Sequence, residues 1–228
     1  MRTKISLFLI AVLCSLNGVA QKAFNKHFEK KSLRIDFALS GNSAFQAAAI
    51  QQLRQEPVWG GPVKNLTDRF NYGGYYVNLY DKASGELIYS RGFNTLFEEW
   101  RSTEQAKNET QAWTNSVSVP YPKRTVVMEI SARDKADMQF RPLLRTDIDP
   151  TSIFIDRGQL KDNKITRIQY EGDPNEKVDL VFLAEGYTAA EQEKFIADAR
   201  KFTESLFDTP PYTSRRKDFN IWAVSLIS

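Results

Sequence analysis

The sequence predicts an α+β chain in two parts, an antiparallel β-sandwich over residues 21–160 and the truncated start of an α/β unit over residues 161–228. Three observations support this prediction. Short segments of alternating apolar and polar residues recur between turn residues up to about residue 156, which is typical of antiparallel sheets. A continuous apolar run, a helical pattern and a second apolar run then follow, which is the order of a βαβ unit. Hydrophobic residues make up 42% of the 228 residues, enough to form a core.

The first 20 residues have the pattern of a secretory signal peptide. A short basic region precedes an apolar core at residues 5–16, which is too short to span a bilayer. Small residues lead up to Ala20, so we expect cleavage between Ala20 and Gln21. A retained membrane anchor is the alternative, and no later segment is apolar enough to span a membrane. We therefore expect a protein that is secreted, periplasmic or held at the cell surface.

The single cysteine lies inside this leader. Leu13 precedes Cys14, where a lipoprotein signal would have a small residue, so ordinary cleavage is favoured over lipidation. The mature chain would then contain no disulfide, and its core alone would stabilise the fold. The formal net charge of +3 falls to +1 when Arg2 and Lys4 are removed. No basic block remains, which argues against nucleic acid as a partner.

The first part of the mature chain reads mainly as strands. Residues 33–39 alternate apolar and polar side chains, which predicts a half-buried strand. Residues 45–54 are rich in alanine and favour a helix, with a strand of small residues as the alternative, and Pro57 ends this element. Residues 125–132 are rich in β-branched side chains and predict a central strand. The other strands are predicted at residues 75–81 and 86–91 (a hairpin), 113–120 and 139–144.

Aromatic side chains are dense in this part. They are Trp59, Tyr72, Tyr75, Tyr76, Tyr80, Tyr89, Phe93, Phe97, Trp100 and Trp113. Core packing with cross-strand aromatic pairs is the favoured interpretation, because alternation along a strand sends only half of them outward. The alternative is a stacking platform, and with it a non-catalytic secreted module that binds a glycan or a protein.

Short strands are predicted at the junction of the two parts, at residues 153–158 and 165–170, and a turn at residues 172–175 leads to the apolar run. Residues 178–184 are apolar without alternation, which predicts a parallel strand covered on both faces. Thr188 and Glu191 have the spacing of a capping box at a helix start. Residues 219–226 read as the second strand of the unit.

The helix between these strands has a single predicted apolar face. Phe195, Ala199, Phe202 and Leu206 recur at spacings of four, three and four, and Pro210 ends the helix. Two parallel strands and one helix do not form a stable sheet alone. We therefore expect the 228 residues to be a fragment, a truncated reading frame or an engineered piece of a longer protein, with Ile221, Trp222 and Val224 partly bare.

The stretch Leu183-Ala184-Glu185-Gly186-Tyr187-Thr188 is the most specific in the chain, and supporting stretches lie at residues 57–62, 75–81, 93–100, 210–212 and 219–224. In these stretches the sequence resembles the secreted IgA-peptidase family of zinc metallopeptidases. The resemblance implies that the β-sandwich is an accessory domain and that residues 161–228 begin a zincin-like catalytic domain. It also implies a protein substrate. Glu185 and Tyr187, which follow a parallel strand, would border the substrate cleft, with a solvent-facing Glu185 as the alternative.

The catalytic motif of that family is His-Glu-x-x-His, in which two imidazoles bind zinc. The chain contains one histidine, His27, so it has no such motif. We therefore predict no catalytic residue, no metal ligand and no cofactor in this chain, and an N-terminal part that is inactive alone.

A Ser-His-Asp triad would need the same histidine, in a start expected to be mobile. A calcium site at Asp147, Asp149 and Asp156 is disfavoured, because their spacing lacks an EF-hand turn.

Overall fold

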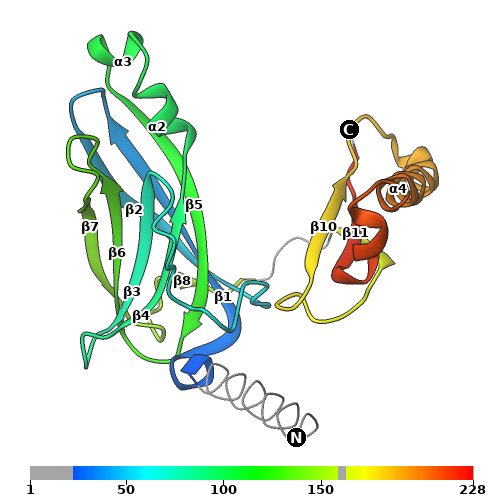
Figure 1. Ribbon diagram of the computed structural model, residues 1–228, viewed down its shortest axis with the longest axis horizontal. Helices are drawn as coiled ribbons and strands as arrows, with labels where there is room; N and C mark the ends of the chain where they lie inside the picture. Colours follow the sequence, from blue (N-terminus) through cyan, green and yellow to red (C-terminus); the bar gives the residue numbers. More distant parts are fainter. Residues whose placement is uncertain (1–22, 159–162, 228) are drawn as a thin grey trace, which may run out of the picture. The chain divides into compact units, whose positions relative to one another are not determined.

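The computed structural model describes residues 23–158 and 163–227. The signal peptide, Cys14 and the cleavage site at Ala20 and Gln21 lie outside the described residues. The chain divides into two compact units between Arg157 and Gly158 (Figure 1). Most of the regular structure is β, in three sheets with few helices. No helix in the described part of the chain is long and apolar enough to cross a membrane.

Unit 1 contains two four-stranded sheets (Figure 1). The first has the strand order β5-β1-β2-β8 and the second the order β4-β3-β6-β7. The first sheet consists of β1 (Phe28–Gly41), β2 (Gln46–Glu56), β5 (Gln111–Pro122) and β8 (Ile155–Asp156). The second sheet consists of β3 (Tyr75–Asp81), β4 (Leu87–Phe93), β6 (Val126–Arg133) and β7 (Phe140–Ile148). All pairings are antiparallel except β2–β8, so the prediction of a purely antiparallel module was wrong at this short strand.

Both sheets contribute to one core. On β1 every second side chain is fully buried, namely Leu33, Ile35, Phe37 and Leu39. These side chains belong to the same cluster as Leu79 of β3 and Ile130 of β6. Burying each such side chain contributes about 1.5–3 kcal/mol. The strand pattern read from the sequence is therefore the pattern that forms the core.

The predicted helix at residues 45–54 is wrong, because this segment is strand β2. It pairs with β1 along its whole length, with Ile50 opposite Phe37. Ala47 and Ala49 are exposed while Ile50 packs against the core, which is the alternation of a strand. Alanine favours a helix by less than about 1 kcal/mol per residue, and pairing with a buried neighbour outweighs that preference.

Most of the aromatic side chains belong to the core, as predicted. Trp59, Trp100 and Tyr89 are less than 10% exposed, and Trp113 packs against the core in a half-buried position. Phe97 and Trp100 are buried on the short helix α2 (Leu96–Trp100), which is followed by α3 (Gln105–Asn108). Because these tryptophan rings are buried, they cannot form the exposed stacking platform that the glycan-binding alternative requires.

Unit 2 is a three-stranded sheet with a helix on one face (Figure 1). Its strands are β9 (Lys164–Gln169), β10 (Val178–Leu183) and β11 (Phe219–Ser225), in the order β10-β11-β9. Between β10 and β11 lie the 3₁₀ turn η1 (Ala189–Glu191), helix α4 (Gln192–Phe207) and the 3₁₀ segment η2 (Tyr212–Asp218). β10 and β11 are parallel, so the predicted strand–helix–strand unit is confirmed.

The predicted apolar face of α4 is partly wrong. The buried side chains are Phe195, Ala199, Thr203 and Phe207, whereas Phe202 is 58% exposed. In the second half of the helix, Thr203 and Phe207 are therefore buried in place of the predicted Phe202 and Leu206. Thr203 is tolerated there because its hydroxyl donates to the Ala199 carbonyl oxygen at 2.8 Å.

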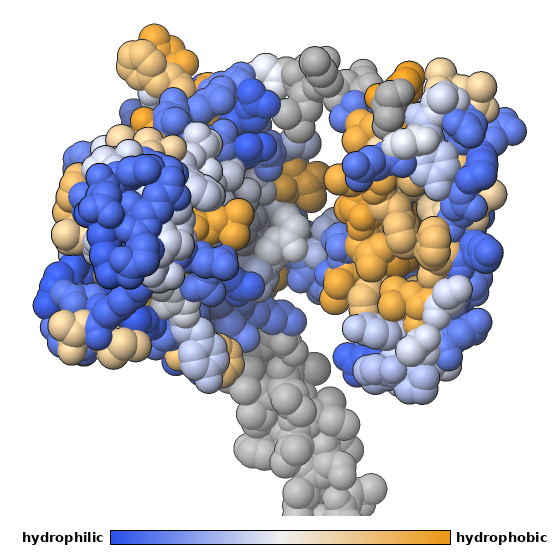
Figure 2. Space-filling model, turned by 90° about the horizontal axis from the view of Figure 1, so that it is seen from above, coloured by the Kyte–Doolittle hydropathy of each residue, from blue (hydrophilic) through white to orange (hydrophobic). Residues whose placement is uncertain are grey.

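Among residues 163–227, the sheet of unit 2 is covered on one face only, which contradicts the expectation that β10 is covered on both. Phe182 packs on the side of α4 with Ala223. On the opposite side Val181 is 48% and Leu183 64% exposed. Figure 2 shows apolar side chains gathered on one side of this unit. Of the three β11 residues predicted to be partly bare, Trp222 and Val224 are half-buried, but Ile221 is fully buried.

Candidate functional site

The first candidate is the turn after β10, where the sequence placed the border of a cleft. The Ala184 N–H donates to the Val224 carbonyl oxygen at 3.1 Å, which extends the parallel pairing by one residue. Gly186 follows with a φ of +76°, a conformation that favours glycine and turns the chain away from the sheet. Glu185, between them, is exposed. The carboxylate is therefore displayed at the carboxyl end of a parallel strand, where α/β enzymes form clefts.

Tyr187 is engaged within the unit. Its hydroxyl donates to Asp198 Oδ2 at 3.0 Å, and its ring centroid lies 5.2 Å from that of Phe195. Lys194 donates to the same carboxylate oxygen at 2.9 Å. The hydrogen bond to Asp198 raises the pKa of Tyr187, and the bonds from Lys194 and Tyr187 lower the pKa of Asp198. Tyr187 is thus a neutral phenol at neutral pH that ties the turn to α4.

The predicted capping box at Thr188 and Glu191 is confirmed. The Glu191 carboxylate accepts from the Thr188 backbone N–H at 3.1 Å and from the Thr188 hydroxyl at 2.8 Å. These bonds lower the pKa of Glu191. A charged carboxylate at the start of a helix is also stabilised by the helix dipole. The turn after β10 is therefore held at both ends, by β11 on one side and by the helix cap on the other.

Two comparisons with known proteins bear on the function. Family models match residues 23–142 as "Peptidase M64 N-terminus" and residues 166–228 as "IgA Peptidase M64". The first match alone covers more than half of the chain. The chain belongs to the peptidase M64 family. The two matches fall within the two compact units, in the same order along the chain. No curated protein matches this M64 chain.

Zinc, which the family resemblance implies, does not fit the residues of this M64 chain. His27 lies next to β1 in unit 1 and is 8% exposed, so it is not in a mobile start, contrary to the expectation. Burial lowers the pKa of His27. Residues 23–158 and 163–227 contain no group of three or more histidine, cysteine, aspartate or glutamate side chains that would hold a metal ion. A catalytic zinc needs three protein ligands, and the described residues do not provide them.

The three aspartates weighed for calcium have partners of other kinds. Asp147 pairs with Lys82. Asp149 accepts from the Thr151 N–H and hydroxyl, both at 2.8 Å, and these bonds lower the pKa of Asp149. Asp156 pairs with Arg54 at 2.8 Å. The structure does not bring the three carboxylates together as a cation site.

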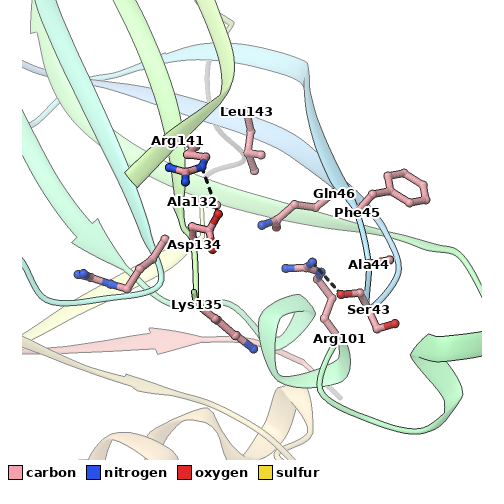
Figure 3. Close-up of a pocket in the computed structure, with 11 residues that line it drawn as sticks. Ser43, Ala44, Phe45, Gln46, Arg101, Ala132, Asp134, Lys135, Arg141 and Leu143 are labelled. Carbon is pink, nitrogen blue, oxygen red and sulfur yellow. Dashed lines mark hydrogen bonds and ion pairs between the residues drawn. The ribbon is translucent and has the colours of Figure 1, made fainter. Parts of the chain in front are cut away.

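A second candidate that the sequence analysis did not find lies in unit 1. It is a pocket of about 320 Å³ between the β1–β2 turn, the end of β6 and the start of β7 (Figure 3). The side chains around it come from segments distant in sequence: Gln46, Arg101, Lys135 and Arg141. Of its eleven lining residues, four are cationic and one, Asp134, is acidic. No local pattern could have predicted it, because its charged residues come from three separate segments, at Arg101, at residues 133–135 and at Arg141.

Proposed function

We propose that this chain is the N-terminal part of a secreted zinc metallopeptidase of the M64 family. Residues 21–160 would form its β-sandwich accessory domain, and residues 161–228 the first strand–helix–strand portion of a zincin-like catalytic domain. The observation that carries the proposal is the "IgA Peptidase M64" match over residues 166–228, which coincides with the parallel β10–α4–β11 unit.

The exposed side of the unit 2 sheet supports the second half of this proposal. Parallel strands are normally covered on both faces. Here Val181 and Leu183 of β10 are about half to two-thirds exposed, and Ile165 of β9 is 62% exposed. We propose that further parts of the catalytic domain pack on this side and that they contain the His-Glu-x-x-His motif. Glu185 and Tyr187 would then border the substrate cleft, with Glu185 displayed and Tyr187 fixing the turn.

The 228 residues alone would not cleave peptides. A zinc site needs at least two histidines in the family motif, and the chain has one. The substrate would be a protein. The family name mentions IgA, but an activity on a particular substrate does not transfer with a family or a fold. The signal peptide at residues 1–20 would direct export of the protein from the cytoplasm, and its removal would leave Gln21 as the N-terminus.

Sequencing the gene beyond codon 228 tests the proposal. We expect an in-frame His-Glu-x-x-His motif downstream, and zinc-dependent cleavage of protein substrates by the extended product. Absence of the motif from every frame would remove the main support for the peptidase assignment. N-terminal mass spectrometry of the exported product tests the localisation, since a product that still begins at Met1 would contradict cleavage at Ala20.

A further inference from the structure

Strand β2 of unit 1 has a free edge along most of its length. On one side it pairs with β1 from Gln46 to Glu56. On the other side β8 pairs only with Leu53 and Arg54. Within the described residues, no strand pairs with residues 46–52 on that side. Their outward backbone N–H and C=O groups therefore have no strand partner there, which is what strand addition requires, and β7 of the other sheet lies close to β2.

This edge lacks the features that normally prevent strand addition. Residues 46–52 read Gln-Ala-Ala-Ala-Ile-Gln-Gln, without a charge, a proline or a glycine. Edge strands are commonly protected by charged side chains or proline. β7, one of the two edge strands of the other sheet, has both, with Pro142 flanked by the exposed Arg141 and followed by Arg145. β5, at the far edge of the first sheet, is also uncharged from Gln111 to Val119 but ends in two prolines, and the pocket does not include it.

The cationic pocket lies at the start of this same edge. Gln46 is both the first residue of β2 and part of the pocket lining. Figure 3 shows its amide and the Arg101 guanidinium extending into one hollow, with Arg141 and Asp134 across from them. A strand added along β2 would therefore bring one end of its chain to the pocket.

Two of the pocket side chains, Arg101 and Gln46, are held in place and keep unused hydrogen-bond donors. The Arg101 side chain is 12% exposed, and its Nε and Nη2 donate to the carbonyl oxygens of Asn42 and Ser43 at 2.8 and 3.3 Å. Gln46 Oε1 accepts from the Tyr75 hydroxyl at 2.8 Å, which fixes the amide and leaves its NH₂ group without a bond in the described structure. A guanidinium has five N–H donors and an ammonium three.

The carboxylates near the pocket are already occupied. Glu98 contacts Arg101 at 3.4 Å and Lys135 at 3.1 Å. Arg141 contacts Asp134 at 3.1 Å and Asp137 at 2.7 Å, and Asp134 also accepts from the Ala136 N–H at 2.8 Å. The groups that remain are therefore N–H donors on cationic or amide side chains. A carboxylate, which only accepts hydrogen bonds, is the ligand group that matches them.

We propose that unit 1 binds an extended acidic peptide. Its backbone pairs with the free edge at residues 46–52, and an aspartate or glutamate side chain enters the pocket of Arg101, Lys135 and Arg141. The strand edge supplies affinity without regard to sequence, and the pocket supplies the preference for an acidic residue. This goes beyond the proposed peptidase function and does not depend on it, because every residue involved lies in unit 1.

Binding of defined peptides to the chain of residues 21–228 tests this proposal, with calorimetry as the readout. The probes are a library of seven-residue peptides of alternating valine and threonine with one glutamate at a varied position. Both ends are blocked, so the glutamate is the only carboxylate. The matched controls are the same peptides with glutamine for glutamate, and with N-methyl groups on alternate amides.

We expect at least one glutamate peptide to bind, its glutamine form to bind about tenfold more weakly, and its N-methylated form not to bind. Hydrogen exchange should show protection of residues 46–52 and not of the β5 edge. Lys135→Gln should weaken binding about fivefold, and Lys82→Gln, a matched change at an exposed ion-paired lysine outside the pocket, should not.

Three results would overturn the proposal. Binding by no peptide of the library refutes it. Equal affinity for glutamate and glutamine forms refutes the pocket, and undiminished binding of the N-methylated form refutes strand addition. None of these results bears on zinc or catalysis, so failure here is distinct from failure of the proposed function.

Discussion

Asn220 provides a direct test of how unit 2 is held together. It is fully buried in the middle of the sheet. Its Oδ1 accepts from the Glu171 N–H at 2.8 Å, and its Nδ2 donates to the Gly172 carbonyl oxygen at 2.9 Å and to Asp179 Oδ1 at 3.1 Å. One side chain on β11 thus ties the turn before β10, and β10 itself, to the central strand.

We expect Asn220→Ala to lower the free energy of unfolding of unit 2 by about 3 kcal/mol, since three hydrogen bonds at roughly 1 kcal/mol each are lost. Asn220→Asp should be at least as damaging despite its near-identical shape. It keeps the acceptor for Glu171 but directs an oxygen at the Gly172 carbonyl and the Asp179 carboxylate. The matched control is Asn163→Ala, an exposed position in the same unit.

Hydrogen exchange of the full chain, followed by mass spectrometry of peptides covering residues 164–169 and 219–225, is the assay. A loss of about 3 kcal/mol corresponds to exchange about 100-fold faster for the most protected amides. Asn163→Ala should leave the rates within about twofold. If Asn220→Ala and Asn163→Ala behave alike, the hydrogen-bond network does not stabilise the unit and the reasoning is wrong.

Three further perturbations test other parts of the structure. Thr188→Ala removes the cap of η1, the turn that leads into α4, and should cost about 1 kcal/mol, seen as faster exchange over residues 189–195 only; unchanged rates there would contradict the cap. Gly92→Ala should cost about 1–3 kcal/mol in a thermal unfolding experiment, because its Cβ would lie 2.1 Å from the Tyr72 carbonyl oxygen, whereas Gly74→Ala, with its nearest atom at 3.5 Å, should cost clearly less. Burial lowers the pKa of His27 below its usual 6.5, so the unfolded chain binds the proton more readily; the stability of unit 1 in urea should be constant above pH 6.5 and fall as the pH drops below it, and His27→Gln, which removes the only histidine, should abolish that fall. An NMR titration giving a His27 pKa above 6.5 would refute the last prediction.

Features set by neighbouring residues were predictable from the sequence. The strand at residues 75–81 and the capping box at Thr188 and Glu191 match the structure, because alternation and cap spacing are local. Helix propensity misled at residues 45–54, where pairing with β1 determines the structure. The parallel pair β10–β11 was also predictable, from two apolar runs separated by a helical pattern.

Features set by distant residues were not predictable. Phe202 is exposed while Thr203 is buried, because the packing partners of α4 decide which stripe faces the sheet. Asn220 is a polar residue inside an apolar run. Its hydrogen-bond partners lie about 40 to 50 residues earlier in the chain, so no local pattern predicts them. The pocket of Arg101, Lys135 and Arg141 joins three segments brought together by sheet topology, so it became visible only in the structure.

The zinc content and peptidase activity of the purified chain of residues 21–228 test the central proposal most directly. The chain should be freed of metal, incubated with zinc, desalted and assayed with a protein substrate. We predict no zinc retained in proportion to protein and no cleavage, because the chain holds a single histidine, buried in unit 1. One zinc ion per chain together with zinc-dependent cleavage would contradict the assignment of this chain as the non-catalytic N-terminal part of an M64 peptidase.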